Sequence, residues 1–160
     1  MTTPEPPTIV PAVLADAPAM LALQRLAFEP EALACQSREI PPLMETLGGI
    51  EAHIRTATVL KAMAGERLVG AIRGIAGDGV CLIRVLVVAP GQQGRGLGAR
   101  LLEAVERAHP HVERFELTTN MIMVGNVRFY LRHGYEVVEQ VQHSPTIRLA
   151  HMRKAVKPAQ

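Results

Sequence analysis

A strand, a glycine-rich loop and a helix follow one another in the middle of the chain, and this unit constrains the fold more than any other feature. Residues Val80 to Val88 form the most apolar run, and their many β-branched side chains predict a central strand buried on both faces. Pro90 ends this strand, and the glycine-rich loop extends from Gly91 to Gly98. An amphipathic helix follows, and its predicted inner face carries Leu97, Leu101, Leu102, Val105 and Ala108. Residues 114–119 have a strand pattern, so the whole unit predicts a right-handed parallel crossover.

The rest of the chain predicts strands and helices on both sides of this crossover. Expected strands cover 8–12, 58–63, 68–75, 135–142 and 146–152, and the last two form a closing antiparallel hairpin. We expect a helix over 16–28 capped by Asp16, a loop or broken helix between Pro30 and Pro42, and a helix over 46–55. A short helix with Leu131 facing inward ends at Gly134.

These elements predict an α+β fold in α/β/α layers. The expected sheet is mixed and mostly antiparallel, with six to seven strands, a central parallel crossover and about four flanking helices. We expect one domain over 8–154, an extended tail over 1–7 and a second tail over 155–160.

Composition excludes several classes of protein. Apolar residues make up 48% of the 160 residues, and 17 Lys and Arg against 15 Asp and Glu give a net charge of +2, so a folded domain is expected. Basic residues form no stripe and aromatic residues are few, so nucleic acid is not an expected partner. The sequence has neither a signal-peptide pattern nor a long apolar run, which predicts a cytoplasmic protein without a membrane partner. Cys35 and Cys81 are expected to be buried thiols, and their spacing predicts no metal site.

The glycine loop predicts a site for a phosphate or pyrophosphate, because free backbone amides and a helix dipole meet there. A P-loop is excluded because no Gly-Lys-Ser/Thr follows. Gly94, Gly96 and Ala99 do fit G-x-G-x-x-A, so a dinucleotide-binding protein stays an alternative at this point.

The segment from Val85 to Ala99 resembles the acetyl-CoA-binding motif of the GCN5-related N-acetyltransferase (GNAT) family, Gln/Arg-x-x-Gly-x-Gly/Ala. Gln93, Gly96 and Gly98 fill that motif. Residues 126–135 are similar to a later family segment with Asn, Tyr and a Gly-aromatic pair. The resemblance covers the order of elements from about 8 to 152.

The resemblance implies acetyl-CoA as cosubstrate and no metal. Backbone groups of Leu86, Val87 and Val88 would pair with the pantetheine arm, and the amides of the glycine loop would hold the pyrophosphate. The implied cofactor-binding residues are Leu86, Val87, Val88, Gln93, Gly94, Arg95, Gly96, Leu97, Gly98, Ala99, Asn126 and Tyr130. The family more often places Asn seven residues before the Tyr, where this chain has Met123.

The resemblance also implies direct attack of a neutral amine on the thioester. Tyr130 would be the general acid that protonates the thiolate, and the Val88 N–H would stabilise the oxyanion. Several family members carry a catalytic carboxylate on the central strand, where this chain offers Cys81 and Arg84. Glu39 and Glu45 are therefore the candidate bases, His143 is a further possibility, and His109 and His111 are expected at the surface.

The expected function is an acetyl-CoA-dependent N-acetyltransferase acting on a primary amine of a small molecule or peptide. Its acceptor contacts would come from the segment between Pro30 and Pro42 and from the final hairpin. A non-catalytic acetyl-CoA-binding module is the alternative, because the strand carboxylate is missing. A homodimer is a possible assembly.

Overall fold

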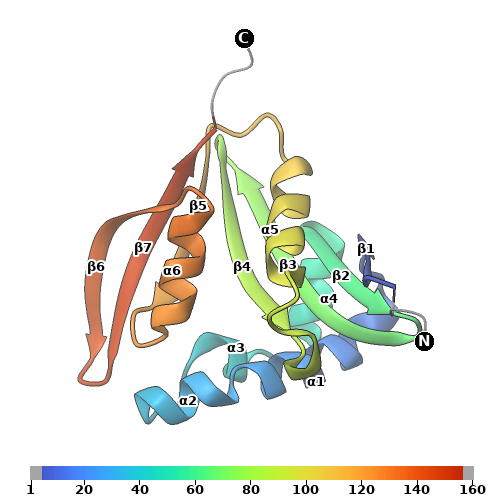
Figure 1. Ribbon diagram of the computed structural model, residues 1–160, viewed down its shortest axis with the longest axis horizontal. Coiled ribbons are helices and arrows are strands. Elements are labelled where there is room, and N and C mark those ends of the chain that lie inside the picture. The colour runs from blue at the N-terminus through green and yellow to red at the C-terminus, as the bar shows by residue number, and fades with distance from the viewer. Residues whose placement is uncertain (1–4, 157–160) are drawn as a thin grey trace.

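The computed structural model describes residues 5–156 and shows a seven-stranded mixed sheet between layers of helices (Figure 1). The strand order is β1-β2-β3-β4-β5-β7-β6, and β4 and β5 form the parallel pair. The strands are β1 (Thr8–Pro11), β2 (Thr58–Ala64), β3 (Arg67–Gly77), β4 (Val80–Val88), β5 (Arg114–Asn120), β6 (Glu136–Ser144) and β7 (Ile147–Ala155). The helices are α1 (Ala17–Ala27), α2 (Glu29–Cys35), α3 (Pro41–Met44), α4 (Leu47–Thr56), α5 (Leu97–Arg107) and α6 (Val124–Arg132), with 3-10 turns η1 (Leu14–Asp16) and η2 (Pro90–Gln92). The predicted fold class is confirmed.

Alternating residues of β3 contact different helices, which places helices on both faces of the sheet. Ile72 lies in the main core with the buried leucines of α5, whereas its neighbour Ala71 packs with residues of α1 and α4. Gly74 allows α5 to approach closely, because a Cβ there would lie 2.8 Å from Val105 Cγ2. The α5 face is therefore one side of the sheet and the α1–α4 face is the other.

The segment between Pro30 and Pro42 is a broken helix, as the sequence predicts. Gln36, in the left-handed region at φ 55°, ends α2. Ala32 and Cys35 of α2 pack with Ile147 of β7, which brings this segment against the closing hairpin. Figure 1 shows α2 and α3 spanning the space below β4 and the β6–β7 hairpin.

One side-chain prediction was confirmed only in part, and two were wrong. Asp16 is the N-cap residue of α1, but its carboxylate makes no capping hydrogen bond, because it accepts from the Val13 N–H at 2.7 Å and pairs with Lys61. Leu131 is 49% exposed, since Phe129 and Tyr130 supply the packing surface of α6. Ala108 is exposed, because α5 ends one residue earlier. The expected tails over 1–7 and 155–160 lie partly outside the described residues.

Two further observations concern the described range. None of the helices between residues 5 and 156 has the length and apolar character that crossing a membrane requires. Over the same range, no three His, Cys, Asp or Glu side chains lie close enough together to hold a metal ion.

Candidate active site

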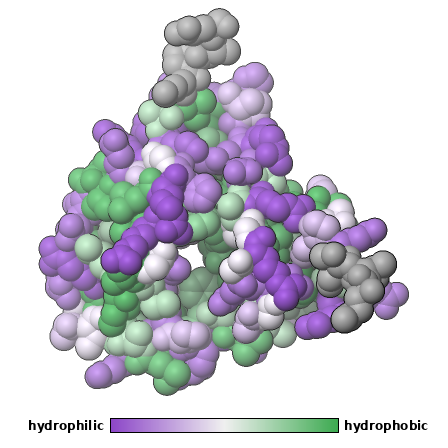
Figure 2. Space-filling view, in the orientation of Figure 1, coloured by the Kyte–Doolittle hydropathy of each residue, from purple (hydrophilic) through white to green (hydrophobic). Residues whose placement is uncertain are grey.

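The parallel strands β4 and β5 separate soon after they begin to pair. Their pairing extends only from Val80 to Leu82 on β4, after which β4 follows β3 and β5 follows β7. A bulge in β4 accompanies the separation, because two residues of β4 stand opposite Ile72, and Val85 adopts φ 53°. The space-filling view shows an opening between β4 and α6, on the side where the strands diverge (Figure 2).

The backbone of β4 turns hydrogen-bonding groups toward this opening. The Ala89 N–H donates to the Val69 carbonyl of β3 at 2.8 Å. Because successive residues of a strand direct their N–H groups to opposite edges, the Val88 N–H points away from β3. The Val88 carbonyl lies on the same edge and accepts from Gln93 Nε2 at 3.2 Å. The arrangement offers an amide donor at the edge that β5 leaves free.

The glycine loop leaves the N-terminus of α5 open. Gly94 and Gly96 adopt φ 78° and 81°, a region that disfavours other residues, and Gly96 is the N-cap of α5 without a side-chain cap hydrogen bond. A Cβ at either position would meet no described atom within 4 Å, so packing does not account for these glycines. Unpaired amides and a helix dipole at an open surface fit a pyrophosphate. Arg95 is exposed on the same loop.

Tyr130 lies half-buried on α6, with its ring held by two other aromatic rings. Phe129 and Tyr135 contact it edge to face, with centroids 5.2 and 5.8 Å away. Burial, together with the negative charge of Glu31, raises the pKa of the Tyr130 hydroxyl to about 12. The group is therefore protonated at neutral pH, as a proton donor must be.

Other residues predicted for the site lie at the surface. Asn126 is exposed on α6, one turn before Tyr130, and Glu39 is exposed in the segment between α2 and α3. His143 is exposed near the end of β6. His109, predicted at the surface, is half-buried beside a surface groove, and its Nε2 atom is buried without a partner among the described residues. Burial lowers its pKa.

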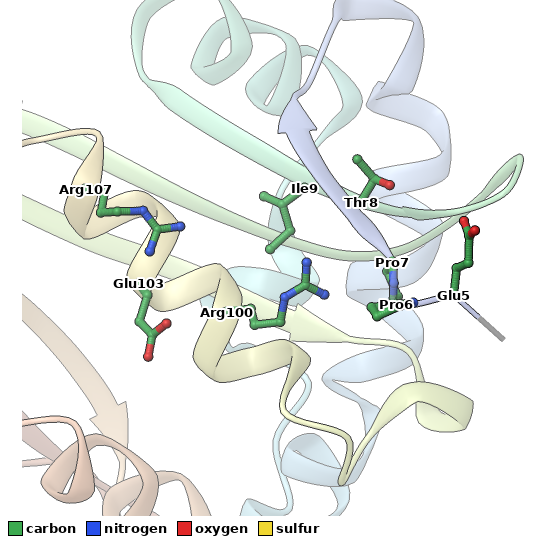
Figure 3. A pocket seen from close by; sticks show the side chains of 8 residues that line it. All are labelled: Glu5, Pro6, Pro7, Thr8, Ile9, Arg100, Glu103 and Arg107. Atoms are coloured by element: carbon green, nitrogen blue, oxygen red, sulfur yellow. The ribbon is translucent and has the colours of Figure 1, made fainter. Parts of the chain in front are cut away.

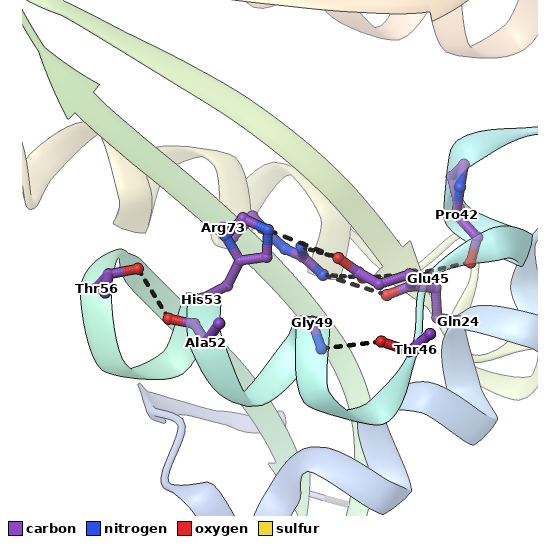
Figure 4. A network of polar contacts seen from close by, with 9 residues as sticks. All are labelled: Gln24, Pro42, Glu45, Thr46, Gly49, Ala52, His53, Thr56 and Arg73. Carbon is purple, nitrogen blue, oxygen red and sulfur yellow. Dashed lines mark hydrogen bonds and ion pairs between the residues drawn. The ribbon is translucent and has the colours of Figure 1, made fainter.

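Glu45 lies in a polar network rather than free in the opening (Figure 4). Its two carboxylate oxygens accept from Nη1 and Nη2 of Arg73 at 2.8 and 2.7 Å, and Gln24 Nε2 donates to it at 2.9 Å. His53 stands 3.6 Å away. Burial alone would raise the pKa of Glu45, but the hydrogen bonds from Arg73 and Gln24 and the charges of Arg73 and His53 bring it below the ordinary value.

Sequence reasoning missed four polar residues of this region: Gln24, Arg73, Glu31 and Asn120. Gln24 and Arg73 are 2% and 4% exposed, and their polar groups interrupt otherwise apolar faces of α1 and β3. A polar residue at a position where an apolar one is expected was the signal that could have indicated this network. Asn120 ends β5 beyond the last residue that pairs with β4 and is also buried, while Glu31 lies half-buried on α2.

Two surface grooves lie away from the opening. One, of about 720 Å³, runs between the segment Glu5–Ile9 and the outer face of α5, where Arg100 and Arg107 project (Figure 3). The other, of about 370 Å³, lies beside His109 at the far end of the sheet. Neither contains Tyr130 or the glycine loop.

Comparison with known proteins agrees with this geometry. The family model described as acetyltransferase (GNAT) domain matches residues 44–156. Among curated protein sequences, none matches this chain. The solved structure of the ribosomal-protein-S18-alanine N-acetyltransferase of Escherichia coli is similar at 14% identity and a TM-score of 0.79, covering 96% of each chain.

Two further structures have the same fold. The ribosomal-protein-alanine N-acetyltransferase of Brucella melitensis is 22% identical with a TM-score of 0.73, covering 92% of this chain and 99% of that one. The yncA protein of Salmonella typhimurium, solved with its cofactor acetyl-CoA, is 17% identical with a TM-score of 0.75, covering 98% and 97%.

Proposed function

This chain belongs to the GNAT acetyltransferase family, and from that premise we propose that it transfers the acetyl group of acetyl-CoA to a primary amine of a small molecule or peptide. The observation that carries the proposal is the opening between β4 and β5 beside the uncapped glycine N-terminus of α5. An extended amide-bearing arm fits the first feature and a pyrophosphate fits the second. The single parallel pair of the described sheet does not support the dinucleotide-binding alternative.

The residues proposed to hold acetyl-CoA follow the β4 edge and the loop. The backbone of Leu86, Val87 and Val88 would pair with the pantetheine arm. The backbone amides of the loop, from Gly94 to Ala99, would bind the pyrophosphate, with Gln93 bracing the Val88 carbonyl. Asn126 and Tyr130 would approach from α6, and Arg95 would add a charge contact.

The proposed reaction is direct transfer, in which this chain positions the reactants and moves protons. The Val88 N–H would stabilise the negative charge that develops on the thioester oxygen during attack by the amine. Tyr130 would donate its proton to the departing thiolate. A thioester supplies the activated acetyl group, so a neutral amine is the remaining requirement.

The described cysteines support direct transfer rather than an acetyl-enzyme. A cysteine nucleophile reacts as its thiolate and needs access to the substrate. Cys35 is 1% exposed and Cys81 is fully buried, and burial raises the pKa of the Cys81 thiol to about 11. Neither side chain meets both conditions.

The two carboxylates predicted as bases differ in their surroundings. Glu45 is committed to Arg73 and Gln24, and a lowered pKa makes it a weaker proton acceptor. Its arrangement fits a role in holding the loop between α3 and α4 onto β3. Glu39 is exposed and stays a candidate as a base.

Thiol release from acetyl-CoA across an amine panel tests this function. The panel should include alkylamines, amino acids, aminoglycosides and an alanyl peptide amide, the last because two similar structures are ribosomal-protein-alanine N-acetyltransferases. We expect thiol release that depends on at least one amine. Calorimetric binding of acetyl-CoA without amine-dependent thiol release would instead favour the non-catalytic module, which the absence of a carboxylate on β4 motivates.

A further inference from the structure

We propose that Glu31 of α2 is the general base that removes the proton of the acceptor ammonium, and that Asn120 orients its carboxylate at the opening between β4 and β5. This inference rests on the proposed function, because it names the proton acceptor of that reaction. A primary ammonium cannot attack a thioester until it loses a proton. Neither β4 nor the network around Arg73 offers a free carboxylate for this purpose, and the other candidate, Glu39, is exposed whereas Glu31 is half-buried.

The position of α2 is fixed by packing against β7. Ala32 and Cys35 are buried in a cluster with Ile147, and Leu149 of β7 packs against the same cluster. Glu31 is the residue before Ala32 and lies half-buried. The helix therefore carries a partly desolvated carboxylate to the side of the sheet opposite α5.

Asn120 faces this carboxylate from β5. It pairs with Leu149 in the antiparallel register, so the two side chains leave the same face of the sheet, toward α2. Asn120 is 4% exposed, and its Oδ1 accepts from the Ile122 N–H at 3.2 Å. Its Nδ2 amide is buried and has no hydrogen-bond partner among the described residues, although it lies close enough to the Glu31 carboxylate to favour the charged form of that group. A buried donor left open in this way is costly in a finished core, and it points to a ligand or water between Asn120 and Glu31.

Tyr130 lies on the other face of the sheet. Its ring packs in the α5 core, whereas Glu31 belongs to the α2 side. The charge of Glu31 nevertheless acts on the Tyr130 hydroxyl. On this edge β5 has no partner strand beyond Glu116, so the sheet is open on the side where the two groups act on each other. The opening thus places a candidate base and a candidate acid on opposite sides of one reaction space.

In the proposed reaction, Glu31 and Tyr130 exchange protons with the substrates so that every proton is accounted for. Two protons leave the acceptor nitrogen. Glu31 takes the first from the ammonium and releases it to solvent. After the amine has attacked, Glu31 takes the second proton and passes it to the Tyr130 phenolate. The C–N bond forms, the C–S bond breaks, and the thiolate receives the Tyr130 proton. Burial raises the pKa of Glu31, and Asn120 opposes this rise only in part. The raised pKa makes the Glu31 carboxylate a better base. Protonated Glu31 no longer repels a phenolate, so Tyr130 becomes a stronger acid when the thiolate forms.

The groups that face Glu31 are few, which simplifies its titration. Tyr130 faces it from α6 and the neutral Asn120 from β5, while α3 and β7 contribute the apolar cluster residues Leu43, Ile147 and Leu149. Glu29 on the same helix pairs with Arg38 instead. E29Q is therefore a matched control for E31Q.

The kinetic test compares both variants with the wild type, using acetyl-CoA and an alanyl peptide amide, or another amine of the panel that the wild type acetylates. We expect E31Q to lower kcat/KM at pH 7 by about 10²–10³-fold, and E29Q to leave it unchanged. The loss in E31Q should shrink as the pH approaches the pKa of the amine, because neutral amine then forms without a base. A loss that is equal at every pH would mean a structural defect and would overturn the proposal, as would full activity of E31Q.

A spectroscopic test needs no acceptor and separates this inference from the proposed function. The chain has two tyrosines and no Trp, so ultraviolet absorbance in a Y135F background follows Tyr130 alone. Stopped-flow alkaline jumps record its ionisation before the protein unfolds. E31Q should lower the pKa of Tyr130 and E29Q should not. An unchanged Tyr130 pKa in E31Q would refute the juxtaposition even in an active enzyme, whereas a wild type inactive toward every amine would refute the function instead.

Discussion

Tyr130 is the residue on which the proposed reaction depends most. Its hydroxyl, with a pKa raised to about 12, has the proton that a departing thiolate needs, and its ring is already held by Phe129 and Tyr135. Y130F keeps this packing and removes the acid. We expect turnover to fall about 10²–10⁴-fold with little change in the acetyl-CoA Kd, measured by single-turnover transfer and calorimetry. An unchanged single-turnover rate in a stably folded variant would remove Tyr130 from the mechanism.

Two substitutions of Gly96, by Asn and by Asp, separate the effect of charge on acetyl-CoA binding from the effect of backbone strain. Both Asn and Asp adopt the left-handed region less readily than glycine, and both would place a side chain of the same size at φ 81°. Only Asp adds a negative charge at the pyrophosphate site. G96D should therefore weaken acetyl-CoA binding far more than G96N, by at least about tenfold in calorimetric Kd. Equal affinities of the two variants would speak against an anion at this helix end.

Residues of the site differ in how far the sequence predicts them. Gly96, Gln93 and Tyr130 belong to short sequence motifs, so the residues that predict their roles lie next to them in the sequence. Glu31 and Asn120 come together only because α2 packs on β7 and β7 pairs with β5. No local pattern contains that information, which is why the sequence directed attention to Glu39 and Glu45 instead.

At the scale of elements, the Arg73–Glu45 ion pair fastens the loop between α3 and α4 to the sheet. Arg73 is 4% exposed, so removing its partner leaves a buried charge. We expect E45A to lower the free energy of unfolding by about 3–5 kcal/mol, measured by denaturant titration. The double variant R73M/E45L should recover much of that loss, because no buried charge remains. A stable E45A protein would show that solvent satisfies Arg73.

Acidic pH should weaken the attachment of the loop between α3 and α4 to the sheet. The folded pKa of Glu45 lies below its unfolded value of 4.5, so its contribution to stability is complete above that pH. As the pH falls through the lowered folded pKa, Glu45 becomes protonated and the contribution disappears. Between about pH 5 and pH 3, the free energy of unfolding of the wild type should therefore fall by more than that of E45Q. Parallel pH curves for the two proteins would contradict this account.

The elements themselves were largely predictable, and their local distortions were not. A near-continuous apolar run located β4, in which Cys81, Ile83 and Val87 are buried, and hydrophobic periodicity located α5, which has one dominant buried face. The bulge at Val85 has no such signal, since a β-branched residue gives no indication of φ 53°. Its cause is tertiary, as β4 must leave β5 while staying paired with β3.

At the scale of the whole molecule, the sheet consists of two halves that share a short parallel seam. Strands β1 to β4 form one half and β5 to β7 the other, joined over Val80–Leu82 (Figure 1). A ligand that pairs along β4 and contacts α6 would bridge the halves. At one hundred times its Kd, acetyl-CoA should stabilise the fold by about 2.7 kcal/mol, which raises the Tm by about 5–11 °C for a domain of this size. G96D should show no such rise, and an equal rise in that variant would contradict binding at the loop.

Acetyl transfer itself is tested most directly by one rapid-quench single-turnover experiment, with enzyme in excess over acetyl-CoA and an acceptor amine present. Thiol, acetylated amine and intact protein mass are measured in the same samples. Direct transfer predicts that thiol and acetylated amine appear in equal amounts and at the same rate, while the protein never carries an acetyl group. Thiol release without acetylated amine, or an acetylated protein that forms and decays during the turnover, would contradict the account.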